Sequence, residues 1–218
     1  MSRDVTFKDI FDILFAHYGP QLWWPAETAF EVMIGAVLVQ NTAWQNASKA
    51  IENLKNAGLM SALAIRDTSS DRLASLIVSS GYFNIKTQRL QALCEWLLEK
   101  GDIAALKNEP LSVLRKDLLA IHGIGNETAD DILLYALEKP IFVIDAYTRR
   151  IFSRLGLVEH DASYKDLQHS FQQALDSDVN LYNEYHALIV THGKHTCQKK
   201  PICMKCCLQQ YCAEARQA

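Results

Sequence analysis

Five of the six cysteines in this chain lie within sixteen residues near its C-terminal end. Four of them follow the spacing C-x5-C-x2-C-x5-C. Reduced thiolates bind soft metals, so in a cytosolic chain this crowding favours a metal centre over disulfides. The spacing alone leaves zinc and an iron–sulfur cluster equally open, because zinc ribbons usually carry two C-x2-C pairs and this segment carries one.

The expected metal ligands are Cys197, Cys203, Cys206 and Cys212. Cys207 is adjacent to one of them and is most simply a spare thiol, although the sequence leaves open which member of the Cys206/Cys207 pair binds the metal. Cys94 lies far away in a segment with helical periodicity, where a single cysteine usually serves as a small buried apolar side chain.

A glycine-rich turn lies in the middle of the segment 118–129, which reads Leu-Leu-Ala-Ile-His-Gly-Ile-Gly-Asn-Glu-Thr-Ala. One helix is expected to end there, and a second begins after the turn through Gly123, Ile124 and Gly125. Two glycines around one apolar residue let backbone N–H groups point outward, where they can hold a phosphate without a charged side chain. An ordinary tight turn between helices is the simpler alternative.

An acidic residue, Asp145, follows a short apolar run eighteen residues after Glu127. At the start of a helix, an aspartate usually acts as an N-cap that accepts hydrogen bonds from backbone N–H groups. A carboxylate held in this way near a phosphate-binding turn would also be well placed to face a sugar.

Helical periodicity dominates the chain that carries these groups. Apolar residues recur three and four positions apart in segments 7–15 and 30–38, and glycine and proline divide the chain into about ten segments of helical length. Segment 140–144 reads locally as a strand, but beside so many helices it predicts an extended connector that leads to Asp145. The predicted fold class is all-α.

The composition excludes several classes of protein. With 218 residues, of which 49% are hydrophobic and 22% charged, the chain can bury a core and is neither disordered nor fibrous. No segment approaches the roughly 20 apolar residues of a membrane span, and the N-terminal residues do not resemble a secretory signal, so we expect a cytoplasmic protein. The formal charge of −3 counts mildly against a nucleic-acid partner, although segment 194–205 carries four lysines and no acidic residue.

The hairpin, the aspartate and the cysteine cluster, in this order and spacing, resemble the endonuclease III branch of the helix-hairpin-helix DNA glycosylases. Segments 30–42 and 191–194 also resemble parts of that family, so the resemblance covers nearly the whole chain. It implies base-excision repair of double-stranded DNA by a monomer associated with the nucleoid, and a [4Fe-4S] cluster as the metal centre.

The resemblance implies two helical domains with DNA between them. A six-helix barrel would cover residues 23–134 and contain the helix-hairpin-helix at 118–129. A cluster domain would combine residues 1–22 with 135–218 and hold the [4Fe-4S] cluster in the loop at 197–212.

One position departs from the bifunctional members of the family. They carry a nucleophilic lysine two residues after the second glycine of the hairpin, and this chain has Glu127 there. A carboxylate cannot form the Schiff base that supports strand cleavage, so the resemblance implies a monofunctional hydrolase without AP lyase activity. Motifs 23–25, 40–44 and 123–127 are most similar to the 3-methyladenine DNA glycosylase III branch, which implies alkylated purines as substrates.

The resemblance also implies roles for single residues. Asp145 would be catalytic, since its charge would stabilise the oxocarbenium-like sugar and its oxygen would orient water. Asn41 would fill the gap left by the flipped nucleotide. Further DNA contacts would be Gln40, Gly123, Ile124, Gly125 and Lys194. The base pocket would be lined by Trp23, Trp24, Pro25, Trp44 and Glu127, although core packing is the alternative for any single tryptophan.

Two other functions stay open. The same fold could serve a glycosylase for oxidised, deaminated or mismatched pyrimidines, which duplexes with single lesions would reveal. The chain could also be a non-catalytic DNA-binding or redox-sensing iron–sulfur protein in which Asp145 is only a helix cap. Loss of base release in Asp145→Asn, with DNA binding retained, would exclude this second possibility.

Overall fold

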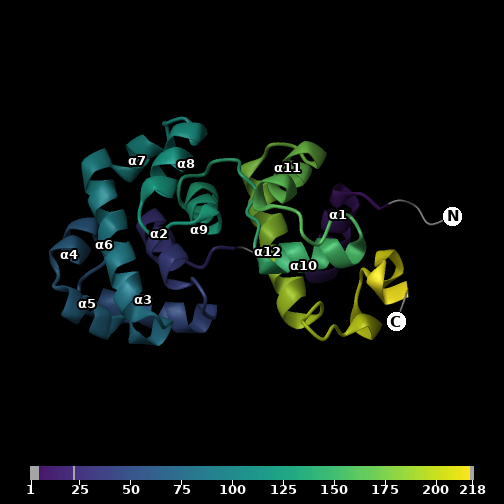
Figure 1. Ribbon diagram of the computed structural model, residues 1–218, viewed down its shortest axis with the longest axis horizontal. Coiled ribbons are helices and arrows are strands. Elements are labelled where there is room, and N and C mark those ends of the chain that lie inside the picture. The colour runs from purple at the N-terminus through teal and green to yellow at the C-terminus, as the bar shows by residue number, and fades with distance from the viewer. Residues whose placement is uncertain (1–4, 22, 217–218) are drawn as a thin grey trace. The chain divides into compact units, whose positions relative to one another are not determined.

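The computed structural model describes residues 5–21 and 23–216, and every regular element in this part of the chain is a helix (Figure 1). The predicted all-α class is therefore confirmed. The chain forms two compact units: an inner unit, Trp24–Lys139, and a terminal unit made of Met1–Trp23 and Pro140–Ala218. The sequence predicted domain boundaries between residues 22 and 23 and between residues 134 and 135. Leu22 lies outside the described residues, and residues 135–139 fall in the inner unit.

The inner unit contains most of the helices. They are α2 (Ala29–Leu38), α3 (Trp44–Asn56), α4 (Ala62–Asp67), α5 (Ser70–Leu76), α6 (Phe83–Lys100), α7 (Ile103–Leu106), α8 (Leu111–Ala120) and α9 (Asn126–Asp131). A 3-10 turn, η1 (Val78–Ser80), precedes α6, and α9 continues into a π-helical turn, η2 (Ile132–Ala136).

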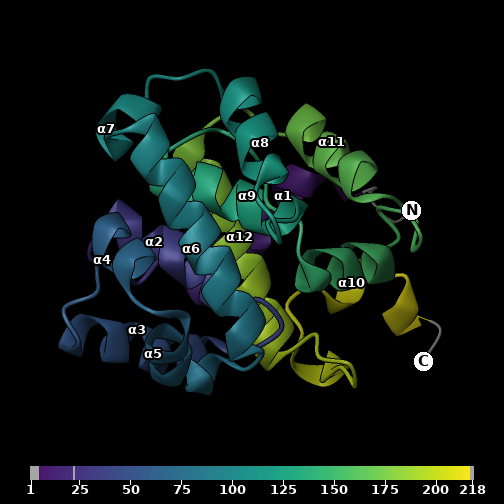
Figure 2. The same ribbon diagram turned by 60° about the vertical axis from the view of Figure 1, so that its left-hand side comes forward.

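Helix α2 lies at the centre of the inner unit. Residues 31–38 are all buried, because the helix is apolar on every side. Helices α3, α6 and α9 and the turn η2 pack around it (Figures 1 and 2). Its one buried charge, Glu31, is paired with Lys55 of α3 at 2.9 Å.

The terminal unit is built around α12 (Val179–His195), on which α1 (Phe7–Tyr18) and α10 (Ala146–Leu155) pack. Helix α11 (Tyr164–Ala174) contacts α1. Its core is aromatic, and the rings of Phe142 and Phe171 stack with centroids 4.1 Å apart. Three short 3-10 turns follow α12: η3 (Cys203–Lys205), η4 (Gln209–Tyr211) and η5 (Glu214–Arg216).

Residues 140–144 form the predicted connector and no strand. The segment is buried, so its backbone groups need partners within the protein. The side chains of α11 provide them: the N–H of Phe142 donates to Oε1 of Gln172 at 3.0 Å, and Nε2 of Gln168 donates to the carbonyl of Phe142 at 2.7 Å. None of the helices in residues 5–21 and 23–216 has the length and apolar character of a membrane span.

Candidate functional site

Asp145 forms the N-cap of α10, and its carboxylate accepts two hydrogen bonds and lies beside an imidazole ring. Its Oδ1 accepts hydrogen bonds from the backbone N–H of Thr148 at 2.7 Å and from the hydroxyl of Thr148 at 2.8 Å. Its Oδ2 lies 3.6 Å from Nε2 of His186 in α12, and 10% of the Asp145 side chain is exposed. The carboxylate is thus partly withdrawn from water and still accessible.

Burial by itself raises the pKa of Asp145, because it disfavours the charged form. The neighbouring His186 and the two donors of Thr148 outweigh this effect, so the pKa lies below its ordinary value. The carboxylate is therefore ionised at neutral pH.

The start of α10 is fixed against α12 by a close contact at Gly193. The ring of Tyr147 packs so tightly on this glycine that a Cβ there would lie 2.4 Å from Cδ1 of Tyr147. Arg150 lies over the same ring and donates to the carbonyls of Gly193 and Cys197 at 3.0 and 2.9 Å. These contacts hold Asp145 beside the helix that carries His186.

Lys194 lies near the same carboxylate, in the last turn of α12. Burial lowers the pKa of Lys194, and the charge of Asp145 partly offsets this shift. The Lys194 Nζ lies 5.5 Å from the ring centroid of Trp23, in cation–π range. The terminal unit therefore gathers a carboxylate, an amine and an indole ring.

The predicted hairpin connects α8 and α9. Gly123 has a φ of 82°, and the buried Ile124 donates its N–H to the carbonyl of Ile121 at 3.1 Å. Gly125 is exposed, and no atom lies within 4 Å of the place where its Cβ would stand. Within the described residues the N–H groups of Gly123 and Gly125 have no backbone acceptor. Backbone N–H groups of this kind, at a turn before a helix, are the ones that bind phosphate in proteins.

A buried ion pair closes the hairpin. The carboxylate of Asp130 in α9 has no exposed side-chain surface, and it accepts hydrogen bonds from Nε and Nη2 of Arg115 in α8 at 2.7 and 3.1 Å. Arg115 also donates to Oδ1 of Asn126 at 3.0 Å. Glu127 is exposed in the first turn of α9, where a negative charge favours the helix.

Three rings of the inner unit form an aromatic cluster, defined as Trp24, Trp44 and Tyr135. Trp24 meets Trp44 edge to face with centroids 5.2 Å apart, and its ring lies 5.1 Å from that of Tyr135. A Cβ on Gly35 of α2 would stand 3.5 Å from both indoles, so the cluster rests directly on that helix. Trp23 belongs to the terminal unit, and Pro25 is exposed before α2.

The loop between α2 and α3 carries two predicted DNA contacts, of which Asn41 is exposed and Gln40 is hydrogen-bonded within the protein. Asn41 is exposed, with a left-handed φ of 54° that asparagine tolerates better than most residues. The amide of Gln40 instead donates within the protein, to the hydroxyl of Thr128 at 2.8 Å and to the carbonyl of Gly123 at 3.2 Å.

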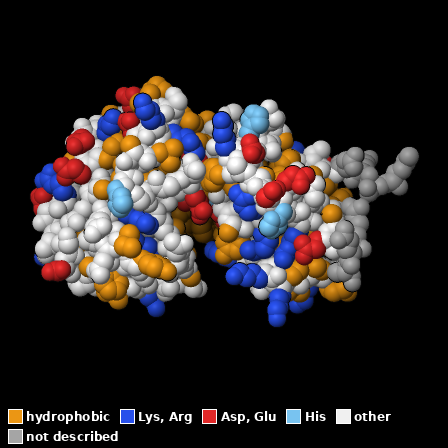
Figure 3. Space-filling view, in the orientation of Figure 1, with side chains coloured by type: hydrophobic (Ala, Val, Ile, Leu, Met, Phe, Trp, Pro, Cys, Tyr) orange, Lys and Arg blue, Asp and Glu red, His pale blue; other side chains and the backbone are white. Residues whose placement is uncertain are grey.

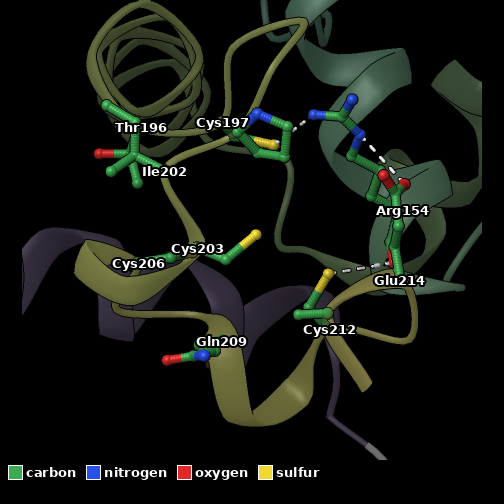
Figure 4. Close-up of a pocket in the computed structure, with 11 residues that line it drawn as sticks. Arg154, Thr196, Cys197, Ile202, Cys203, Cys206, Gln209, Cys212 and Glu214 are labelled. Carbon is green, nitrogen blue, oxygen red and sulfur yellow. Dashed lines mark hydrogen bonds and ion pairs between the residues drawn. The ribbon is translucent and has the colours of Figure 1, made fainter. Parts of the chain in front are cut away.

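Four cysteines line one cavity after α12: Cys197, Cys203, Cys206 and Cys212. Figure 4 shows them around this cavity, with Arg154 at its edge. Cys207 does not line it. Nη1 of Arg154 lies 3.5 Å from Sγ of Cys197, and Nε2 of His192 lies 3.6 Å from Sγ of Cys206. In the described part of the chain, no three His, Cys, Asp or Glu side chains are grouped tightly enough to hold a metal ion.

Lysine and arginine side chains gather on the surface of the terminal unit, over α10 (Figure 3).

Residues 34–177 match the family model of the HhH-GPD superfamily base excision DNA repair proteins. The chain belongs to this superfamily. It is therefore a DNA glycosylase of base-excision repair, and DNA is its partner.

Relatives of this glycosylase include a putative DNA repair glycosylase and an endonuclease III. It is 44% identical to a putative DNA repair glycosylase of Methanocaldococcus jannaschii, over 93% of this chain and 94% of the relative. It is 31% identical to endonuclease III of Sulfolobus acidocaldarius, over 84% of this chain and 81% of the relative.

Solved structures agree with the fold. The H. pylori 3-methyladenine DNA glycosylase (MagIII) bound to 1,N6-ethenoadenine has a TM-score of 0.73 and 31% identity, and the match covers 84% of this chain and 96% of that one. A non-covalent endonuclease III–DNA complex has a TM-score of 0.82 and 20% identity, covering 96% and 95% of the two chains, and supports the fold alone.

Sequence reasoning missed three residues around these sites in the glycosylase. His186 is far from Asp145 in sequence, and no motif marks it. Tyr135 lies in the π-helical turn η2, which shifts a side chain relative to the usual helical period. Arg89 contacts both Gln40 and the hairpin, and nothing in the sequence around it indicates this role.

Proposed function

We propose that this glycosylase is monofunctional and hydrolyses the N-glycosidic bond of alkylated purines of the 3-methyladenine type. The observation that carries the proposal is the ionised carboxylate of Asp145, held at the start of α10 by Thr148 and His186. Glu127 stands where a bifunctional relative would need an amine.

The reaction needs few groups from the protein. As the bond between C1′ and the base nitrogen breaks, its electron pair goes to the base, which an alkyl group has already made cationic, so no strong general acid is required. Asp145 stabilises the positive charge that develops on the sugar. Its carboxylate also orients a water molecule, whose oxygen bonds to C1′ and whose proton passes to the carboxylate.

The aromatic cluster supports the choice of a cationic purine. A cation over an indole or phenol ring gains about 0.5–2 kcal/mol, and the faces of Trp24, Trp44 and Tyr135 supply such rings. The MagIII protein, which is 31% identical, binds a modified adenine. We keep Trp23, Pro25 and Glu127 as proposed members of the pocket.

DNA contacts are assigned by the chemistry of the exposed groups. The N–H groups at Gly123 and Gly125, beside the buried Ile124, would hold a phosphate, and Lys194 would contribute a charge. Asn41, exposed on a left-handed turn, would enter the stack in place of the flipped nucleotide.

The cysteine cavity suits a [4Fe-4S] cluster. Four thiols line it, as such a cluster requires, and the turns η3 and η4 bury no side chain of their own that could hold the segment. Cys197, Cys203, Cys206 and Cys212 would bind the iron, and the bound cluster would fix the fold of the segment.

The test is incubation with DNA that carries 3-methyladenine and 7-methylguanine, followed by chromatography of the released bases. We expect both bases to appear, and no covalent complex to form when borohydride is added. The 31% identity to an endonuclease III favours one competing function, a glycosylase for damaged pyrimidines. Release of thymine glycol or uracil from control duplexes, without release of methylated purines, would replace our substrate assignment with that one.

A further inference from the structure

The side chain of Gln40 bridges two parts of the inner unit that are far apart in sequence. Its Oε1 accepts a hydrogen bond from Nη1 of Arg89 at 2.5 Å. Its Nε2 donates to the hydroxyl of Thr128 and to the carbonyl of Gly123. The residue next to Asn41 is therefore bonded to both α6 and the hairpin.

The chemistry of these partners allows only one orientation of the Gln40 amide. A guanidinium can only donate and a carbonyl can only accept, so the amide oxygen must face Arg89 and its nitrogen must face Gly123. If the amide were flipped, its N–H groups would face the N–H groups of Arg89, and its oxygen would face the carbonyl oxygen of Gly123. Arg89 thus determines which end of Gln40 reaches the hairpin.

Arg89 also packs directly against the hairpin turn. A Cβ on Gly123 would lie 2.3 Å from Nε of Arg89 and 2.6 Å from its Cγ. The first glycine of the hairpin is therefore needed for two reasons: its φ of 82°, and the arginine that occupies the space where a side chain would be.

A second cation of α6 secures the other end of the same loop. Lys86, one turn before Arg89, is 1% exposed, and its Nζ donates to the carbonyls of Leu38 at 2.8 Å and Ser80 at 2.6 Å. Leu38 is the last residue of α2. One face of α6 therefore holds both the end of α2 and Gln40, which lies two residues beyond that end.

We propose that Arg89 is a positioning residue which, through Gln40, sets the spacing between the turn that carries Asn41 and the phosphate-binding turn of the hairpin. The inference rests on the proposed roles of Asn41 and the hairpin in DNA binding. It assigns Gln40, which the sequence suggested as a DNA contact, to the interior link between two DNA contacts.

Gln40→Glu tests this link with almost no change in shape. The carboxylate would still accept from Arg89, but it would place an oxygen against the carbonyl oxygen of Gly123. We would measure binding to a duplex that carries a tetrahydrofuran abasic-site analogue, with 2-aminopurine in the opposite strand to report unstacking. We expect binding about fivefold weaker, as for the loss of one buried hydrogen bond, and a smaller rise in 2-aminopurine fluorescence.

Arg89→Met and the double variant complete the experiment. Because both residues act through one link, we expect the double variant to bind about as weakly as either single variant. Gln91→Glu is the matched control, since Gln91 of α6 also donates its amide to a backbone carbonyl, that of Thr68 at 3.0 Å, away from the hairpin. We expect this control to bind and unstack DNA like the parent protein.

Wild-type binding and fluorescence from Gln40→Glu, or additive losses in the double variant, would overturn the inference. If Arg89→Met does not fold, Gln40→Glu alone decides. The abasic duplex contains no damaged base, so the outcome is independent of the substrate assignment. A protein that releases no methylated purine but shows the expected pattern would refute the proposed function and support the link.

Discussion

The ionised state of Asp145 depends on His186 and on a residue three positions away, Thr148. Thr148 supplies a backbone donor and a hydroxyl donor to the same carboxylate oxygen. The helix cap therefore also lowers the pKa of Asp145, beside the larger effect of His186. The sequence predicted the cap, and it could not predict the pKa, because the contribution of His186 comes from another helix.

Thr148→Val should move the acid limit of base release. The variant keeps the backbone donor and loses the hydroxyl at 2.8 Å, so the pKa of Asp145 should rise. The pKa is depressed in the folded protein, so the active, ionised form persists above that pKa and is lost as the pH falls through it. We expect the acid limb of the pH–rate profile to shift to higher pH, measured as single-turnover base release.

Ser163→Ala is the control for Thr148→Val. Ser163 caps α11, a different helix from the one that Asp145 caps, by accepting from the N–H of Asp166 at 3.2 Å. Its loss should weaken a helix cap and leave the acid limb unchanged. An equal shift of the acid limb in both variants would mean that this limb reports the stability of the protein and not the ionisation of Asp145.

At the scale of elements, the two glycines of the hairpin have different roles: Gly123 is needed for folding, and Gly125 leaves the backbone open to DNA. Gly123→Ala should destabilise the protein, since the new Cβ would meet Arg89 at 2.3 Å at a φ that L-residues rarely adopt. Gly125→Ala should fold normally, because its surroundings are open, and should weaken DNA binding by covering the exposed backbone. Thermal denaturation and duplex binding would separate the two effects. Equal destabilisation by both changes would contradict this division.

Removing one partner of the ion pair between α8 and α9 should destabilise the protein, because the other charge would stay buried without a partner. Arg115→Met removes the guanidinium from a carboxylate with no exposed surface, which should reduce the free energy of unfolding by about 3 kcal/mol in urea titrations. Arg66→Met is the control, because Arg66 pairs with the exposed Asp67 and its loss should have no measurable effect. Similar midpoints for the two variants would show that Asp130 tolerates the loss.

The sequence predicted those elements that depend on local pattern. The turn of the hairpin was visible because two glycines stand between two segments with helical periodicity. Trp23 and Trp24 are neighbours in sequence, but they belong to different units because the boundary falls between them, and local pattern does not mark it. Tyr135 was missed because it joins Trp24 through a contact across more than a hundred residues of chain.

At the scale of the whole molecule, the terminal unit depends on a segment with almost no core of its own. Cys206→Ser should therefore lose iron and acid-labile sulfide, and Cys207→Ser should keep both, because only Cys206 lines the cavity with Cys197, Cys203 and Cys212. Elemental analysis of the purified variants would measure this. Zinc in place of iron would contradict the proposed [4Fe-4S] cluster, and loss of metal only in Cys207→Ser would contradict the proposed ligand set.

Asp145→Asn tests the central claim most directly. Asparagine caps helices as well as aspartate does, so the variant should fold with an unchanged melting temperature and bind lesion-bearing duplex normally. Without the charge, release of 3-methyladenine should fall by at least about 100-fold. Undiminished release of the base by this folded, DNA-binding variant would contradict the account.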